Sequence, residues 1–512
     1  MVQFIDTRSG KITGMTFSDV IIKGLAPSGG LFVPNELPRM TADAIKQLRT
    51  MPYHERAAAV YKLFNLDIAD DELDALCRAS YAKQFDDERI AVLNSIEPHT
   101  HVLELWHGRT SAFKDMALQC MPRLFSAALG IKRAQDPHYP NMMILVATSG
   151  DTGKAALEGF AGREGCSITV LYPESGVSQI QRKQMVTQQG NNVQVYGVRG
   201  NFDDCQNTVK AVFNDVSFNE KLKADRNVLL SSANSINFGR LMPQIVYYLS
   251  ACADLWDEEN LGDGAVLDVC VPTGNFGNIL GAYYAKCMGA PLGRLICASN
   301  ENKILTDFLS TGTYDISERP FIKTPSPSMD ILISSNMERM LYHLADAQRV
   351  ARWMQELKEN RCFTVDKETF EKMRELFCAD FATNEESLAT IKEVYDEHHY
   401  VCDPHTAVAW EVGQRTRDAQ NPLLIVSTAH WAKFAPDVLR AFTQTPAGSA
   451  FEAPYAAQSE FEQLESIREL APEGSPIPRN LATLKDAEER FNEVIDAGAP
   501  SCEERLISQG RA

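Results

Sequence analysis

The chain has 512 residues, of which 44% are hydrophobic and 23% are charged, and its formal net charge is -18. This length allows two or three domains with a large core. The negative charge, without any block of Lys and Arg, argues against binding to nucleic acids or to anionic membranes, because both require a concentrated basic surface. The N-terminus has no apolar signal segment and no apolar run could cross a bilayer, so a cytoplasmic location is expected.

The twelve cysteines are scattered between Cys77 and Cys502, and none belongs to a C-x-x-C pair. A structural zinc site or a dense disulfide framework needs closer spacing. Free thiols in a reducing compartment are therefore expected. Because His107, His405 and His430 are far apart in the sequence, we assign no metal site.

Residues 1–97 form the first predicted region, and helical periodicity over 41–64 and 71–85 predicts that it is largely helical. Residues 98–512 form the second region, in which an apolar run, a small-residue loop and a helical stretch recur. The apolar runs are 142–148, 166–174, 192–200, 228–234, 265–271, 294–300 and 421–428.

Continuous apolar runs that alternate with helices are typical of parallel strands buried on both faces. The predicted fold class is therefore α/β, with two doubly wound, mostly parallel sheets, and right-handed crossovers. In such sheets ligands bind beyond the carboxyl ends of the strands, so the loops there are the candidate sites. Residues 313–335 predict a long loop near a site, and the acidic tail after Thr443 is expected to wrap the surface.

The segment HGRTSAFKD (107–115) follows a strand-like run at 102–106 and contains Lys114 between Phe113 and an aspartate. One interpretation is an exposed lysine that pairs with a surface carboxylate. The other is a desolvated lysine, because burial lowers the pKa of the amine and frees it as a nucleophile that forms an imine.

The segment PTGNFGN (272–278) lies between a predicted strand and a predicted helix. Two glycines allow close approach of a ligand, and a helix N-terminus favours an anion such as phosphate. The alternative is a tight turn that needs glycine for its geometry alone.

Three further loops contain polar residues that follow predicted strands. Ser149, Asp151 and Thr152 could bind a carboxylate or a phosphate, and the alternative is a plain helix cap. Asn237 and Arg240 could bind an anionic group, or could be a cap and an exposed arginine. In STAHWAKF (427–434), the Thr428 hydroxyl could donate to a ligand or act as a cap.

Together these segments resemble the threonine synthase family, which are pyridoxal-phosphate enzymes of the tryptophan-synthase β-like fold (fold type II). The resemblance runs from RSGKITGMTFSDVIIKGLAPSGGLFVPNELP through HGRTSAFKD, ATSGDTGKAALEGF and PTGNFGNILGAYYAKCMG to STAHWAKF. It is nearest to the longer, fungal and enterobacterial branch. It implies that O-phospho-L-homoserine and water are converted to L-threonine and phosphate, with pyridoxal 5'-phosphate as cofactor.

The resemblance also implies roles for individual residues. Lys114 matches the lysine that bonds to the cofactor, and Thr428 matches the hydroxyl that faces the pyridine nitrogen. The loop for the cofactor phosphate corresponds to Gly274, Asn275, Phe276, Gly277 and Asn278. The substrate-binding residues correspond to Ser149, Asp151 and Thr152 around the carboxylate, and to Asn237 and Arg240 near the substrate phosphate. Arg109 departs from the family's HGPT pattern and adds a charge near the mouth of the site.

Two other functions fit the same residues. A phospholyase would release phosphate from the same substrate and form 2-oxobutyrate, and a non-catalytic protein would bind the cofactor without turnover. The expected partner is a small-molecule substrate, and the sequence leaves monomer and homodimer open.

Overall fold

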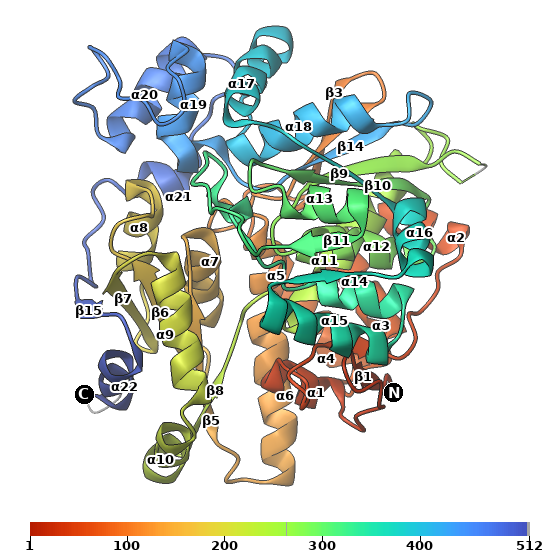
Figure 1. Cartoon of the computed structure of the whole chain (residues 1–512), viewed down its shortest axis with the longest axis vertical. Coiled ribbons are helices and arrows are strands. Elements are labelled where there is room, and N and C mark those ends of the chain that lie inside the picture. Colours follow the sequence, from red (N-terminus) through yellow and green to blue (C-terminus); the bar gives the residue numbers. More distant parts are fainter. Residues whose placement is uncertain (263, 509–512) are drawn as a thin grey trace.

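Two mostly parallel β-sheets lie in separate halves of the computed structural model, which describes residues 1–262 and 264–508 (Figure 1). The larger sheet has the order β13 (Phe377–Phe381), β10 (Leu292–Ser299), β9 (Leu267–Pro272), β14 (Leu423–Ser427), β4 (Thr100–Glu104) and β3 (Val92–Glu97). The smaller sheet has the order β15 (Val494–Asp496), β7 (Val193–Arg199), β6 (Cys166–Pro173), β5 (Asn141–Ala147) and β8 (Val228–Ser231). Only the β3–β4 pair of these two sheets is antiparallel. The predicted fold class is confirmed.

Helices cover both faces of the larger sheet. Alternate residues of a strand point to opposite faces, and here both sets are apolar and are buried under helices. Cys270 and Ile425 belong to the core that faces α18 (Pro404–Thr416). Val269 and Val426 belong to the core that contains α11 (Phe238–Leu255) and α12 (Gly277–Met288). Continuous apolar strands are therefore required here, as the runs at 265–271 and 421–428 predict.

The smaller sheet is covered in the same way. One face packs on α7 (Asp151–Phe160) and α8 (Gln179–Val186), and the other on α9 (Phe202–Asn214), α10 (Val216–Arg226) and α22 (Ala499–Ser508). Strand β15 pairs in parallel with the edge strand β7. The tail predicted to wrap the surface therefore does more than that, because it supplies an edge strand and a covering helix.

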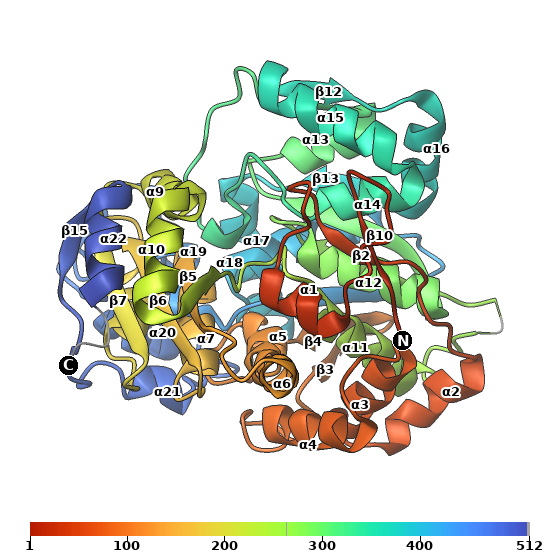
Figure 2. The same cartoon turned by 90° about the horizontal axis from the view of Figure 1, so that it is seen from below.

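The N-terminal region contains four α-helices and two short paired strands, seen from below in Figure 2. These are β1 (Phe4–Asp6), α1 (Phe17–Lys23), β2 (Phe32–Pro34), α2 (Ala42–Gln47), α3 (Tyr53–Leu63) and α4 (Asp70–Tyr81). The boundary predicted at residue 97 falls between β3 and β4, which pair with each other. The division into regions 1–97 and 98–512 stays a prediction.

The remaining elements connect the two halves or pack around them. The helices are α5 (Lys114–Leu118), α6 (Met121–Gln135), α13 (Ile304–Thr311), α14 (Met337–Leu344), α15 (Ala347–Asn360), α16 (Lys367–Leu376), α17 (Asn384–His398), α19 (Ala435–Thr443), α20 (Glu460–Leu470) and α21 (Arg479–Ala482). The short 3-10 helices are η1 (Leu48–Thr50), η2 (Pro327–Met329) and η3 (Trp431–Phe434), and β11 (Thr313–Asp315) pairs with β12 (Cys362–Thr364). Among the described helices, none is both long and apolar enough to cross a membrane. All twelve cysteines are free thiols.

Candidate active site

Lys114 is the first residue of α5, and it is only 8% exposed. Its Nζ lies 3.5 Å from Asp151 Oδ2, 3.5 Å from Ser328 Oγ and 4.7 Å from the centre of the Phe113 ring. Burial lowers the pKa of Lys114, and although the Asp151 carboxylate opposes this, the positive charges of Lys433 and Arg240 add to it. The surroundings are those of a desolvated nucleophilic amine, as the second interpretation of the sequence requires.

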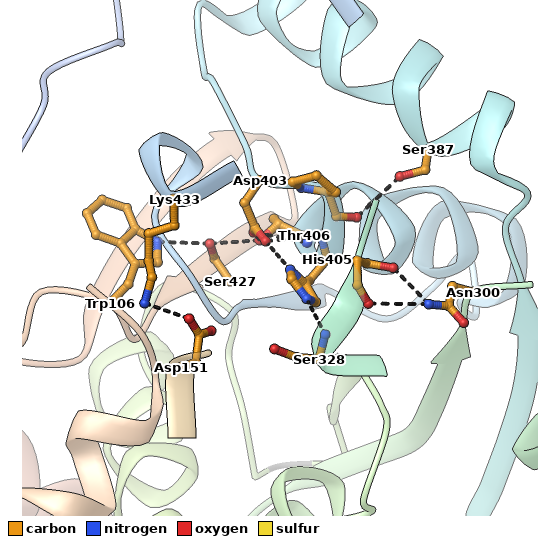
Figure 3. A network of polar contacts seen from close by, with 12 residues as sticks. Trp106, Asp151, Asn300, Ser328, Ser387, Asp403, His405, Thr406, Ser427 and Lys433 are labelled. Atoms are coloured by element: carbon orange, nitrogen blue, oxygen red, sulfur yellow. Dashed lines mark hydrogen bonds and ion pairs between the residues drawn. The ribbon is translucent and has the colours of Figure 1, made fainter. Parts of the chain in front are cut away.

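Asp151 begins α7 and is shared between two lysines. The Lys433 ammonium lies 2.6 Å from Asp151 Oδ1 (Figure 3). Lys114 Nζ approaches the other oxygen at 3.5 Å. Gln181 Nε2 also donates to Oδ1 at 2.9 Å. Burial alone raises the pKa of Asp151, but the two lysines outweigh it and hold that pKa well below its ordinary value. The carboxylate is therefore ionised, and Lys433 is its nearer partner.

The predicted phosphate loop lies against the long loop that contains Ser328. A Cβ atom on Gly274 would lie 2.7 Å from the Ser328 carbonyl oxygen, so glycine is required there. Ser334 Oγ donates to the Gly274 carbonyl at 2.8 Å, and Asn336 donates to the Asn275 carbonyl. Residues 313–335, predicted as a long loop near a site, contain the short strand β11 and the 3-10 helix η2, and Ser328 of this segment contacts Lys114.

Two buried side-chain nitrogen atoms near this loop, one of Asn278 and one of Arg240, make no hydrogen bond within the described residues. Asn278 Oδ1 accepts from the hydroxyls of Tyr247 and Tyr248 at 2.5 and 2.6 Å, and this leaves Nδ2 buried without a hydrogen bond. The Arg240 guanidinium donates to the Ala233 carbonyl at 3.0 Å, but its Nε is likewise unpaired. Burial lowers the pKa of Arg240 to about 10. Unpaired buried donors of this kind fit anionic ligands.

The other residues predicted for the site have different surroundings. Thr428 is buried, and its carbonyl accepts from the Phe113 N–H at 2.8 Å, which joins its strand end to the Lys114 loop. Ser149 and Thr152 are half-buried, and their hydroxyls have no hydrogen-bond partner within the described residues. Asn237 instead caps α11 through the Gly239 N–H and donates to the Ile21 carbonyl at 2.8 Å. Both the oxygen and the nitrogen of its side-chain amide therefore make hydrogen bonds within the chain. The predicted contact of Asn237 with the substrate stays a prediction.

A buried Asp–His pair supports the long loop from behind. Asp403 Oδ2 lies 2.5 Å from His405 Nδ1, and His405 Nε2 accepts from the Ser328 N–H at 3.2 Å (Figure 3). This arrangement requires the proton on Nδ1, where it is donated to the carboxylate. The pair therefore fixes the residue whose hydroxyl faces Lys114.

Three residues of the site were not predicted from the sequence: Lys433, Ser328 and His405. Lys433 is in the segment 427–434, but no local pattern distinguishes a fully buried lysine from an exposed one. His405 follows Pro404 at a helix start, where it has no apparent chemistry until the fold places Ser328 against it. The Pro and Ser content of residues 313–335 was the only available signal for Ser328.

Outside this site, His101, Glu258 and Glu259 form the one group of potential metal ligands within the described residues. His101 Nε2 lies 2.6 Å from one oxygen of Glu259, and His99 Nδ1 lies 2.7 Å from the other. These hydrogen bonds satisfy both oxygens, and the cluster is explained as a polar link between β4 and the segment after α11.

Comparisons with known proteins match the whole architecture. The family model described as "Threonine synthase N terminus" matches residues 3–81, "Pyridoxal-phosphate dependent enzyme" matches 102–427, and "Threonine synthase, C-terminal" matches 406–503. Threonine synthase of Schizosaccharomyces pombe is 38% identical over 462 residues, which are 85% of this chain and 88% of that protein. The crystal structure of threonine synthase from Brucella melitensis with bound PLP has a TM-score of 0.86 and 36% identity, and covers 100% of both chains.

Threonine synthase-like 1 of Homo sapiens is 42% identical over 441 residues, or 84% of this chain. The chain spans 58% of the length of that protein. These matches and the lysine site show that the chain belongs to the pyridoxal-phosphate-dependent enzymes. Within that class, it belongs to the threonine synthase family, and the resemblance seen in the sequence is confirmed.

The residues present fit pyridoxal phosphate. Lys114 supplies a buried amine for the aldehyde, and the unpaired Nδ2 of Asn278 and the N-terminus of α12 suit its phosphate. A Cβ on Gly277 would point into space bordered at 3.4 and 3.8 Å by the amide nitrogens of Asn336 and Gln244. The glycine therefore leaves a polar cradle open beside the loop.

Proposed function

We propose that the chain is a threonine synthase, which converts O-phospho-L-homoserine and water to L-threonine and phosphate. One observation supports this above all: a buried lysine amine faces Asp151 close to Arg240, a buried guanidinium that has no carboxylate partner among the described residues. A substrate with both an amino-acid head and a phosphate satisfies that pair of features. The family membership supports the same reaction.

Different residues of the site bind the two ends of the substrate. Arg240 binds the substrate phosphate, since a guanidinium donates two parallel hydrogen bonds to such a group. The hydroxyls of Ser149 and Thr152 and the N-terminus of α7 bind the substrate carboxylate. Binding both ends orients the carbon chain in the cavity and excludes water until phosphate has left.

Lys114 moves the protons. Its ε-amine would remove a proton from Cα of the bound substrate and then act at Cβ as base and acid. Bound pyridoxal phosphate supplies an electron sink for the negative charge that develops at Cα. Thr428 would present a neutral hydroxyl to the pyridine nitrogen of the bound cofactor, and this would leave that nitrogen less firmly protonated than a carboxylate would.

The decisive experiment supplies O-phospho-L-homoserine to purified protein loaded with pyridoxal phosphate and quantifies phosphate, threonine and 2-oxobutyrate together. Equal amounts of threonine and phosphate support the proposal. Phosphate with 2-oxobutyrate identifies a phospholyase, and no product despite bound cofactor identifies a non-catalytic binding protein. The matched control is Lys114→Ala, which is expected to form no product.

A cytoplasmic location is part of the proposal. It is supported by the twelve free thiols, nine of which are buried, as expected for a reducing compartment. Fractionation of the source cells, followed by detection of the protein in the cytosolic fraction, tests this location.

A further inference from the structure

A polar cavity of about 510 Å³ lies between the Lys114 loop, α6 and α7. Its lining includes four cationic side chains, one carboxylate and several amides. The charged members are Arg109, Arg123, Lys154, Arg163 and Glu158. Four positive charges less one negative charge give the lining a net charge of +3, in a chain whose total is -18. The volume is in the range of small-molecule sites, about 300–1,000 Å³.

The single carboxylate neutralises only part of this charge. Glu158 pairs with Arg109 at 3.0 Å and with Lys154 at 3.1 Å. Neither Arg123 nor Arg163 has a carboxylate within ion-pair distance in the described part of the chain. Arg123 donates to the Gln119 carbonyl, and Arg163 Nε donates to the Gly159 carbonyl at 3.2 Å.

Both unpaired guanidinium groups are held in unfavourable surroundings. Arg123 is only 9% exposed, and burial together with the nearby charge of Arg163 lowers its pKa to about 10. Burial also lowers the pKa of Arg163. Burying charged groups without counter-ions costs free energy, so a cluster of this kind is stabilised when an anion enters it.

We propose that this cavity binds a small phosphorylated molecule, whose phosphate pairs with Arg123 and Arg163. Two planar guanidinium groups suit phosphate because each can donate two parallel hydrogen bonds. The amide of Gln188 and the ammonium of Lys154, which contact each other, supply further donors at the same wall. The remaining volume accepts an organic group attached to the phosphate.

This site is separate from the one around Lys114. Asp151 begins α7 at the Lys114 site, whereas Lys154 and Glu158 lie one and two turns further along, and a turn rises about 5.4 Å. The two sites are nevertheless connected, because Arg109 belongs to the Lys114 loop and Gln119 Nε2 donates to Asp115 Oδ1 at 3.5 Å. The proposed site is independent of the proposed reaction.

The test measures binding of inorganic pyrophosphate to the cofactor-loaded protein by titration calorimetry. The cavity variant is Arg123→Gln/Arg163→Gln. Its matched control is Arg352→Gln/Arg374→Gln, which removes the same charge from exposed residues of α15 and α16. We expect at least tenfold weaker binding in the cavity variant, affinity within twofold of wild type in the control, and unchanged basal turnover in both.

Equal affinity in the cavity variant and wild type would overturn the proposal. Binding that is lost in Arg240→Gln but retained in the cavity variant would also overturn it, because the pyrophosphate would then occupy the Lys114 site. Arg163→Gln alone changes a half-buried residue, and it keeps the test valid if the double variant does not fold. That single variant is expected to weaken binding about threefold, and an unchanged affinity would count against the site.

Discussion

Replacing Lys433 with methionine is expected to make Lys114 a poorer nucleophile. Lys433 is fully buried, and its Nζ lies 2.6 Å from one Asp151 oxygen, while Lys114 is 3.5 Å from the other. Lys433→Met removes a positive charge near Lys114 and frees Asp151 to pair with it. Both changes raise the pKa of Lys114, because each favours its charged form.

The magnitude follows from the spacing of the two ammonium groups. Two unit charges about 6 Å apart repel each other by about 3 kcal/mol at an effective dielectric constant of about 20. Only the neutral amine attacks an aldehyde. Since each 1.4 kcal/mol is about tenfold in an equilibrium, this repulsion corresponds to about two pH units. The midpoint of cofactor capture should therefore move upward by about two pH units, and capture below it should slow by about a hundredfold.

The assay follows the absorbance change when cofactor-free protein captures pyridoxal phosphate between pH 6 and 10, roughly the range spanned by a shifted lysine. Asp115 and His430 also face Lys433, and Arg240 faces Lys114, so the wild-type profile is needed as the reference. Lys183→Met, which removes a lysine of α8 from its partly buried pair with Glu489, is the matched control and should leave the midpoint unchanged.

Stability gives a second measurement on the same variant. Breaking a buried ion pair costs about 3–5 kcal/mol, and we expect the lower end because Gln181 and Lys114 still contact Asp151. Urea unfolding measures this change. A variant that folds, loses this stability and keeps the wild-type midpoint would refute the electrostatic role and leave Lys433 with a purely structural one.

Four further substitutions test the site. Lys114→Ala should abolish the absorbance of the bound cofactor and lower turnover by at least about 10³-fold; turnover that persists means another residue is the base. Gly277→Val should weaken cofactor retention at least about tenfold in equilibrium dialysis, because a β-branched side chain fills the cradle; unchanged cofactor content contradicts the cradle. Thr428→Asp should increase the amount of side products detected by mass spectrometry, because a carboxylate stabilises the protonated form of the pyridine nitrogen more than a hydroxyl does. An unchanged ratio of side products to threonine would reject this role of Thr428. His405→Phe should lower kcat about tenfold with little change in KM, because the Ser328 N–H loses the imidazole nitrogen that accepts its hydrogen bond. The control is a variant that keeps His405 but destabilises the fold by the same amount. An equal loss of kcat in that control would show that His405 does not act by positioning Ser328.

Local patterns were sufficient for the strands but left alternatives open for the site residues. The run at 166–174 is mostly apolar because β6 is buried on both faces between two layers of helices. The neighbours of Lys114 in the chain, an aromatic residue and an aspartate, left an exposed and a desolvated lysine open, and the family resemblance favoured the desolvated one. For the glycines of 274–278 the sequence left open the close approach of a ligand and a requirement of local geometry. At Gly274 the structure shows the geometric requirement, because the Ser328 carbonyl leaves no room for a Cβ.

Strand β15 is a part of the fold that the sequence alone did not indicate. Val494–Asp496 has only three residues, too few for periodicity to distinguish it from a loop. It becomes a strand because β7 offers an unpaired edge. Its backbone hydrogen bonds come from that partner, which lies almost 300 residues earlier in the chain.

The amino-acid sequence by itself indicated the α/β class, the family resemblance and Lys114 as a candidate nucleophile, because each depends on residue patterns that are visible along the chain. Only the tertiary structure decided the electrostatic surroundings of that lysine. Asp151, Ser328 and Lys433 come from three distant segments, and their effect on Lys114 depends on distances of a few ångströms. Charge interactions in a buried site vary with distance and burial, and neither quantity exists until the chain has folded.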